Sequence, residues 1–115
     1  MNPDKNIFRL KHILDSINKI NIITEDVTYE NFKENWIVQD VVVRNLEIIG
    51  EASNHVDENI RAKFPNVAWN EIRGLRNIIV HVYFELDSSQ IWNTIQHNIP
   101  ELKIQINQIL TNLEK

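Results

Sequence analysis

Apolar residues recur at three- and four-residue steps along most of the 115-residue chain. This spacing places them on one side of an α-helix, so it predicts amphipathic helices rather than strands. The apolar pattern indicates four long helices, at residues 3–23, about 36–56, 71–84 and 88–113. The last of these should kink or restart near Pro100, because proline cannot continue regular helical hydrogen bonding.

Shorter elements fill the gaps between the long helices. Thr28 is suited to cap a short turn of helix, and another short helix should precede a break at Pro65. The chain has only 2 glycines and 3 prolines, too few for the sharp turns of an all-β protein. We therefore predict an all-α fold, an antiparallel bundle of four to five helices in a single domain, residues 1–115.

Gly50 lies inside the second long helix, where glycine costs roughly 1 kcal/mol relative to alanine. A close crossing with another helix would explain why a side chain is missing there.

Composition limits the possible chemistry. The chain has no cysteine, which excludes disulfides and thiolate metal sites. Its formal charge of −4 argues against a general nucleic-acid coat protein, although a local basic patch remains compatible with it. No apolar run approaches the roughly 20 residues of a membrane span, and the N-terminus lacks the apolar block of a signal peptide. We expect a cytoplasmic protein that does not enter membranes.

The helix at 71–84 carries an unusual polar side within "RGLRNIIVHVYF", residues 73–84. Successive helical residues are rotated by about 100°, which separates two faces. The apolar face comprises Leu75, Ile78, Ile79 and Val82. The polar side gathers Arg73, Arg76, Asn77, His81 and Tyr83. Charged and amide groups are costly to bury, so this side is expected to face solvent or a binding cleft.

Local charge favours a phosphate-containing ligand. Residues 61–83 contain four basic residues and one acidic residue, a local charge of +3 within an acidic chain. A guanidinium group is well shaped to bind a phosphate, and imidazole transfers protons near neutral pH. Arg76 and His81 are therefore candidate catalytic residues for phosphodiester cleavage without a metal, with Asn77 and Arg73 as supporting polar residues that could hold the phosphate. A solvated face without chemistry is the simpler alternative reading of the same spacing.

The segment "RNIIVHVY", residues 76–83, follows the pattern Arg-x4-His-x-Tyr. It resembles the HepT-like toxins of the HEPN superfamily (higher eukaryotes and prokaryotes nucleotide-binding domains). "RNLEIIGEAS" at 44–53, "VAWNEIRGLRN" at 67–77 and "YFELDSSQIWNTIQHNIPEL" at 83–102 are similar to further parts of that family. The resemblance covers residues 36–110, and the motif itself shows no departure.

This resemblance implies a HEPN-like helical homodimer that acts as a metal-independent endoribonuclease. It also implies the toxin of a type VII toxin–antitoxin system, with no cofactor. Arg76 and His81 would be its catalytic residues, and Asn77 and Arg73 its supporting polar and RNA-binding residues. The implied partner is an MNT-type nucleotidyltransferase antitoxin that silences the toxin by AMPylation of Tyr83. One helix offers one imidazole, whereas cleavage benefits from both a base and an acid. We therefore expect the two chains to build a composite site at the dimer cleft.

Two alternatives stay open. In the first, the chain is a non-catalytic nucleotide- or RNA-binding partner of a nucleotidyltransferase, with Arg76 and His81 binding phosphate only. Separately, Glu47, Glu51 and His55 lie along one helical stripe and could supply part of a metal site, but no matching Glu-x-x-His helix exists. A charged stripe is the favoured reading, in which Arg44 pairs with Glu47 or Glu51 and the acids orient Arg73 or Arg76.

The remaining histidines and the tryptophans are given structural roles. His12, His55 and His97 are expected at the surface, without arginines around them. The tryptophans Trp36, Trp69 and Trp92 are expected as core or interface anchors, with base stacking as the alternative for Trp69.

Overall fold

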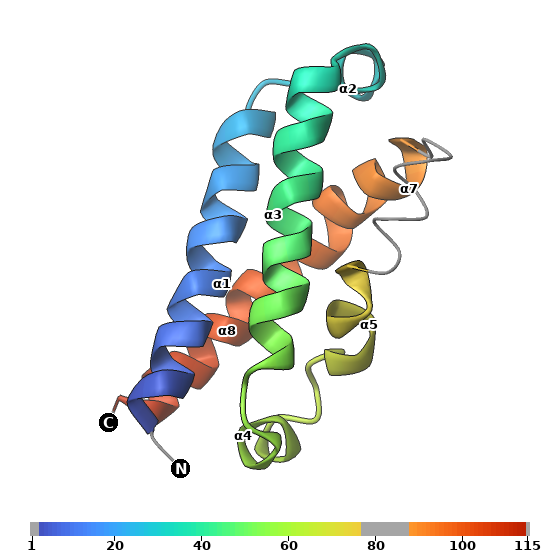
Figure 1. Cartoon of the computed structure of the whole chain (residues 1–115). Coiled ribbons are helices and arrows are strands. Elements are labelled where there is room, and N and C mark those ends of the chain that lie inside the picture. The colour runs from blue at the N-terminus through green and yellow to red at the C-terminus, as the bar shows by residue number, and fades with distance from the viewer. Residues whose placement is uncertain (1–2, 77–87, 115) are drawn as a thin grey trace.

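The computed structural model describes residues 3–76 and 88–114, and these residues form helices and turns without a strand. The long elements are α1 (Pro3–Thr24), α3 (Trp36–Asn54) and a run made of α7 (Ser88–Asn93), η1 (Thr94–Asn98) and α8 (Ile99–Leu113). In Figure 1, α1 and α3 lie side by side and run in opposite directions, while α8 crosses behind them. The all-α, HEPN-like prediction is confirmed.

The core lies between these long helices. α1 contributes Leu10, Ile13, Ile17 and Ile20, each with no solvent exposure, and α8 contributes Leu102, Ile106 and Ile109. α3 adds Val42, Leu46 and Ile49 from its inward face. Burial of such aliphatic side chains, about 1.5–3 kcal/mol each, is the main force that holds the bundle together. The predicted helices at 3–23 and 36–56 are thus confirmed, although α3 ends two residues early, at Asn54.

A short helix, α2 (Tyr29–Glu34), connects α1 to α3. The predicted cap is confirmed, because the backbone N–H of Asn31 donates to the Thr28 hydroxyl at 3.2 Å. The Asn35 side chain then caps α3 by accepting from the backbone N–H of Val38 at 3.1 Å. Each cap satisfies a backbone donor that the first turn of a helix would otherwise leave free.

α4 (Glu58–Lys63) follows the end of α3 and precedes the predicted break at Pro65. Its start is fixed to α1 by the buried Asn6. The Asn6 amide nitrogen donates to the Asp57 carboxylate at 2.8 Å, and its oxygen accepts from the Asp57 backbone N–H at 3.0 Å. These two bonds determine where the chain turns after α3, and hence where α4 and α5 approach it.

The helix predicted at 71–84 begins earlier than expected, as α5 (Trp69–Arg73). A start at residue 71 would make Asn70 the cap, but the helix starts at Trp69, with Ala68 at the cap position and no side-chain cap bond. The buried Trp69 indole donates to the Phe64 carbonyl at 3.0 Å, so a packing anchor, rather than a polar cap, fixes this start.

Gly74 lies inside the range predicted as a continuous helix, 71–84, yet it forms the C-cap of α5 with φ −75° and ψ −9°. Glycine has a low helix propensity, which explains an interruption at this position. Helical conformation resumes at Leu75 and Arg76. Residues 77–84 of the predicted helix lie outside the described residues.

The predicted helix at 88–113 is confirmed, and its irregularity is a π-helical turn, η1, placed directly before Pro100. Within η1 the backbone N–H of Ile99 bonds to the Thr94 carbonyl, five residues back. Proline at position 100 cannot donate to the carbonyl four residues earlier and would crowd it. A wider turn accommodates both effects, which explains why the restart precedes the proline.

In the described ranges, 3–76 and 88–114, no helix combines the length and the apolar content that crossing a bilayer requires.

Candidate functional site

The end of α5 comes very close to α3, and Gly50 makes this approach possible. A Cβ built on Gly50 would lie 3.2 Å from the backbone nitrogen of Arg76 and 3.2 Å from the carbonyl oxygen of Ile72. Such contacts are tighter than side chains normally accept, so only glycine fits without movement. The close helix crossing expected at Gly50 is therefore confirmed, and it places Arg76 against the outer face of α3.

Arg76 forms an ion pair with Glu51 of α3. Its terminal nitrogen NH1 lies 2.5 Å from Oε2 of Glu51, and the two side chains are 42% and 50% exposed. The guanidinium group is thus oriented by the protein and also reachable from solvent. The expectation that the acidic stripe of α3 orients an arginine of the motif is confirmed. Arg44 and Glu47 form the second expected pair, at 3.9 Å.

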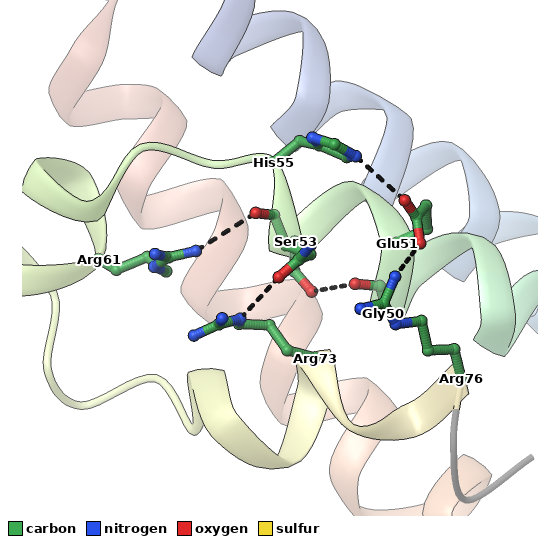
Figure 2. A network of polar contacts seen from close by, with 8 residues as sticks. Gly50, Glu51, Ser53, His55, Arg61, Arg73 and Arg76 are labelled. Atoms are coloured by element: carbon green, nitrogen blue, oxygen red, sulfur yellow. Dashed lines mark hydrogen bonds and ion pairs between the residues drawn. The ribbon is translucent and has the colours of Figure 1, made fainter.

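The second oxygen of Glu51 is also engaged. Oε1 lies 3.0 Å from Nε2 of His55, one helical turn further along α3. The hydrogen bond from Arg76, followed by that from His55, lowers the pKa of Glu51 below its ordinary value. Glu51 is therefore an ionised acceptor at neutral pH, held between a guanidinium and an imidazole, as Figure 2 shows.

Two further arginines reach the same end of α3 (Figure 2). Nε of Arg73 donates to the side-chain oxygen of Asn54 at 3.1 Å, and NH1 of Arg61 lies 3.5 Å from the Asn54 carbonyl oxygen. Both partners are uncharged. Arg73 and Arg61 thus keep a full positive charge in these contacts, in contrast to Arg76, whose charge is balanced by Glu51. The last turn of α3 therefore gathers three guanidinium groups, a surface suited to phosphate.

Of the predicted site residues, Arg73 and Arg76 are placed by the structure, and they meet at the end of α3. Asn77, His81 and Tyr83 lie outside the described residues. Their predicted roles, including catalysis by His81 and modification of Tyr83, stay predictions.

From the sequence, His55 was expected to lie away from the arginines, and Asn54 was not singled out. His12, His55 and His97 are all exposed, as expected. However, the expectation that His55 lacks nearby arginines is wrong, because it shares Glu51 with Arg76. The spacing of four residues between Glu51 and His55 was visible in the sequence. What the spacing could not show is that α5 ends against that same turn.

The three tryptophans lie in different environments. Trp69 is only 8% exposed, so it anchors the core and is not available as a base-stacking platform. Trp92 packs against Phe32, with ring centroids 5.2 Å apart. Trp36 is 69% exposed and is therefore not a core residue.

A pocket of ≈ 200 Å³ opens beside this surface, between α5, η1 and α8. Its floor is apolar, with Ile72, Leu75 and Leu102, and its charged lining residues are Glu71 and Glu101. Among residues 3–76 and 88–114 this lining carries two acids and no base, which disfavours phosphate, so the arginine-rich end of α3 is the better candidate for a nucleic-acid contact. No group of three metal-binding side chains gathers within residues 3–76 and 88–114.

Comparison with known proteins agrees with this geometry. Residues 13–109 match the profile of the family described as "Ribonuclease HepT-like". The chain belongs to the HepT-like ribonuclease family. The resemblance noted from the Arg-x4-His-x-Tyr motif is thus confirmed, and so is the ribonuclease class predicted from it.

Relatives of this HepT-like chain come from several microorganisms. It is 41% identical over 97 residues to the Methanocaldococcus jannaschii protein named "Putative RNase MJ1380", which covers 84% of the chain and 89% of that protein. It is 36% identical over 106 residues to "Putative RNase MJ0125" of the same organism, covering 92% and 91%. "Probable ribonuclease HepT" of Thermococcus cleftensis is 34% identical over 94 residues, covering 82% and 86%. No solved structure matches the chain significantly.

Proposed function

We propose that this HepT-like chain is a metal-independent endoribonuclease and the toxin of a type VII toxin–antitoxin system. The observation that carries the proposal is Arg76, the first residue of the motif. Its guanidinium group is half exposed and is held by Glu51 at the end of α3, beside Arg73 and Arg61. A pre-oriented arginine on a basic surface is what a ribonuclease needs to bind the phosphate that it cleaves.

The proposed reaction is attack of the RNA 2′-hydroxyl on the adjacent phosphorus. A bond forms between the 2′-oxygen and phosphorus while the bond from phosphorus to the 5′-oxygen breaks. His81 accepts the proton of the 2′-hydroxyl, and a second imidazole donates a proton to the departing 5′-oxygen. Arg76 binds the non-bridging oxygens, which carry extra negative charge in the transition state. Asn77 and Arg73 help to hold the RNA.

In this proposal the second imidazole comes from the other chain of a homodimer, so that each cleft contains groups from both protomers. A mixed dimer with one His81→Ala chain tests the arrangement. Half of the normal activity would mean that each chain cleaves independently, whereas near-total loss would support a shared site.

The proposed regulator is an MNT-type nucleotidyltransferase that transfers AMP to the hydroxyl of Tyr83. An added adenylate brings bulk and a phosphate that could occupy the guanidinium of Arg76 in place of RNA. Mass spectrometry of the chain after co-expression with a neighbouring nucleotidyltransferase tests this step. Restored growth with unmodified Tyr83 would refute it.

The decisive experiment is incubation of the purified protein with RNA in the presence of a chelator. We expect cleavage that persists without free metal and falls by about 100-fold or more in Arg76→Ala and His81→Ala. His12→Gln, on the exposed surface of α1, is a matched histidine control and should cleave normally. Tight nucleotide binding without turnover would instead favour the alternative function, a non-catalytic partner of a nucleotidyltransferase.

A further inference from the structure

Glu51 is the central residue of a three-membered contact. One carboxylate oxygen binds Arg76 and the other binds His55, so the two partners approach from different sides of the same group (Figure 2). We propose that His55 is a positioning residue: it fixes the Glu51 carboxylate in the orientation that holds the Arg76 guanidinium toward the RNA phosphate. The kinetic part of this inference rests on the proposed ribonuclease function, whereas the contact itself does not.

The direction of the hydrogen bond follows from the charge of Glu51. Because its pKa is lowered by Arg76 and then by His55, Glu51 is ionised at neutral pH. An ionised carboxylate accepts hydrogen bonds only. Nε2 of His55 must therefore carry a hydrogen and donate it. Both the neutral ring with hydrogen on Nε2 and the charged ring meet this requirement.

A second contact is needed because an exposed ion pair is a weak constraint. Glu51 and Arg76 are each about half exposed, and such pairs lose much of their energy to side-chain entropy and solvent screening. His55 sits four residues after Glu51 on α3, where side chains are neighbours on the helix surface. Its ring restrains the carboxylate from the same helix, so that the free rotation of Glu51 is reduced before Arg76 binds.

The contact leaves Arg76 able to bind substrate. Glu51 engages one terminal nitrogen, NH1, whereas a guanidinium has five N–H donors arranged in a planar fork. The nitrogens Nε and NH2 can therefore bind two oxygens of a phosphate at once. In this arrangement Glu51 fixes the orientation of the Arg76 guanidinium, and His55 fixes the orientation of the Glu51 carboxylate.

Other charged groups near His55 do not replace this role. From α4, Arg61 approaches the Asn54 carbonyl, and from α5, Arg73 binds the Asn54 side chain. Neither of these contacts involves Glu51. The pair Arg44–Glu47 lies on the same exposed stripe of α3 at 3.9 Å, and within residues 3–76 and 88–114 it has no third partner, so it provides an internal comparison.

The first test measures the contact without RNA. The titration of the Glu51 carboxyl carbon is followed by NMR in the wild-type protein and in His55→Ala, His55→Gln and Arg76→Ala. We expect the pKa of Glu51 to rise in His55→Ala, to rise further in Arg76→Ala, and to stay closer to wild type in His55→Gln, whose amide can still donate. An unchanged Glu51 titration in His55→Ala would overturn the proposal.

The second test measures single-turnover cleavage of RNA. Loss of orientation should lower the rate of His55→Ala by about tenfold to a hundredfold, with a smaller change in KM. His55→Gln should recover most of the rate, and Glu47→Gln should behave as wild type. If His55→Gln is as slow as His55→Ala, the imidazole itself is required and positioning is refuted. If the wild-type protein cleaves no RNA, the proposed function fails, while the NMR result still decides the role of His55.

Discussion

Gly50 of α3 lies against the backbone of Arg76, close enough that an added methyl group would sit 3.2 Å from the Arg76 nitrogen. The two nearest atoms, the Arg76 nitrogen and the Ile72 carbonyl oxygen, belong to the backbone, which cannot swing away as a flexible side chain can. The Arg76 segment must therefore shift by a few tenths of an ångström to admit a side chain at this position. The position of the motif arginine thus depends directly on the absence of a side chain at residue 50.

We expect Gly50→Ala to lower the melting temperature and the cleavage rate together, although alanine is the better helix former by about 1 kcal/mol. Gly74→Ala is the matched control. Gly74 has a negative φ, and the atoms nearest to its added Cβ, at 3.2 and 3.5 Å, are the carbonyl oxygens of Asn70 and Glu71. These belong to its own preceding turn, beside which a helical Cβ ordinarily lies, whereas the atoms that crowd Gly50 belong to a different segment. Gly74→Ala should be neutral or stabilise by about 0.4–1 kcal/mol. A Gly50→Ala protein that is as stable and active as wild type would contradict the close-approach argument.

The ion pair between Arg76 and Glu51 should respond to acid in a defined direction. The ordinary pKa of the glutamate is 4.5, and hydrogen bonds from Arg76 and His55 lower it in the folded chain. Because the folded pKa is depressed, the stabilisation from this pair is complete above the ordinary pKa. It is lost as the pH falls through the folded value.

The measurement is the melting temperature of wild type minus that of Glu51→Gln across pH. We expect a small difference at neutral pH, since the pair is half exposed, and a decline towards zero on acidification below 4.5. High salt should reduce the difference as well. A difference that grows on acidification would show that Glu51 binds a proton more tightly in the folded chain, opposite to the assignment made here.

The buried Asn6 side chain should contribute more to stability than its position near the chain start suggests. It is 2% exposed and makes both a donor and an acceptor bond with Asp57. Asn6→Ala leaves the partly buried backbone N–H of Asp57 without its partner, which costs about 1–3 kcal/mol. Denaturant unfolding measures this loss. Asn18→Ala, on the exposed face of α1, should be neutral or slightly stabilising. Equal effects at both positions would mean that the hydrogen bonds between Asn6 and Asp57 add nothing to stability.

The prediction of the fold succeeded where local physics decides the outcome. Periodic apolar residues located the helices predicted at 3–23, 36–56 and 88–113, Thr28 capped α2 as expected, and the irregularity near Pro100 was correct in place. The start of α5 was wrong because a tertiary contact, the indole of Trp69 on the Phe64 carbonyl, overrides the capping preference of Asn70.

The candidate site could be predicted from the sequence only in part, because local patterns reveal some of its residues and tertiary contacts decide the others. The motif identified Arg76, and the acidic stripe of α3 suggested its partner. The involvement of His55 depends on where α5 ends relative to α3, a long-range relationship that spacing within one helix cannot encode. Arg73 was predicted as an RNA-binding residue, but that its partner is the neutral Asn54 was visible only in the structure.

Arg73 should contribute to RNA affinity through its charge. Its Nε hydrogen bond goes to an uncharged amide, so its positive charge remains available to a phosphate. Each phosphate contact made with a single-stranded nucleic acid releases counterions, which adds about 0.7 to the slope of log affinity against log salt. Arg73→Gln should therefore weaken RNA binding and reduce that slope by about this amount, whereas Arg73→Lys should preserve it.

Lys33→Gln is the control for this prediction. It removes the same charge from the exposed lysine of α2 that pairs with Glu30, and it should leave the slope unchanged. If Arg73→Gln and Lys33→Gln have equal slopes, Arg73 does not contact the RNA backbone and serves only to hold α5 against α3.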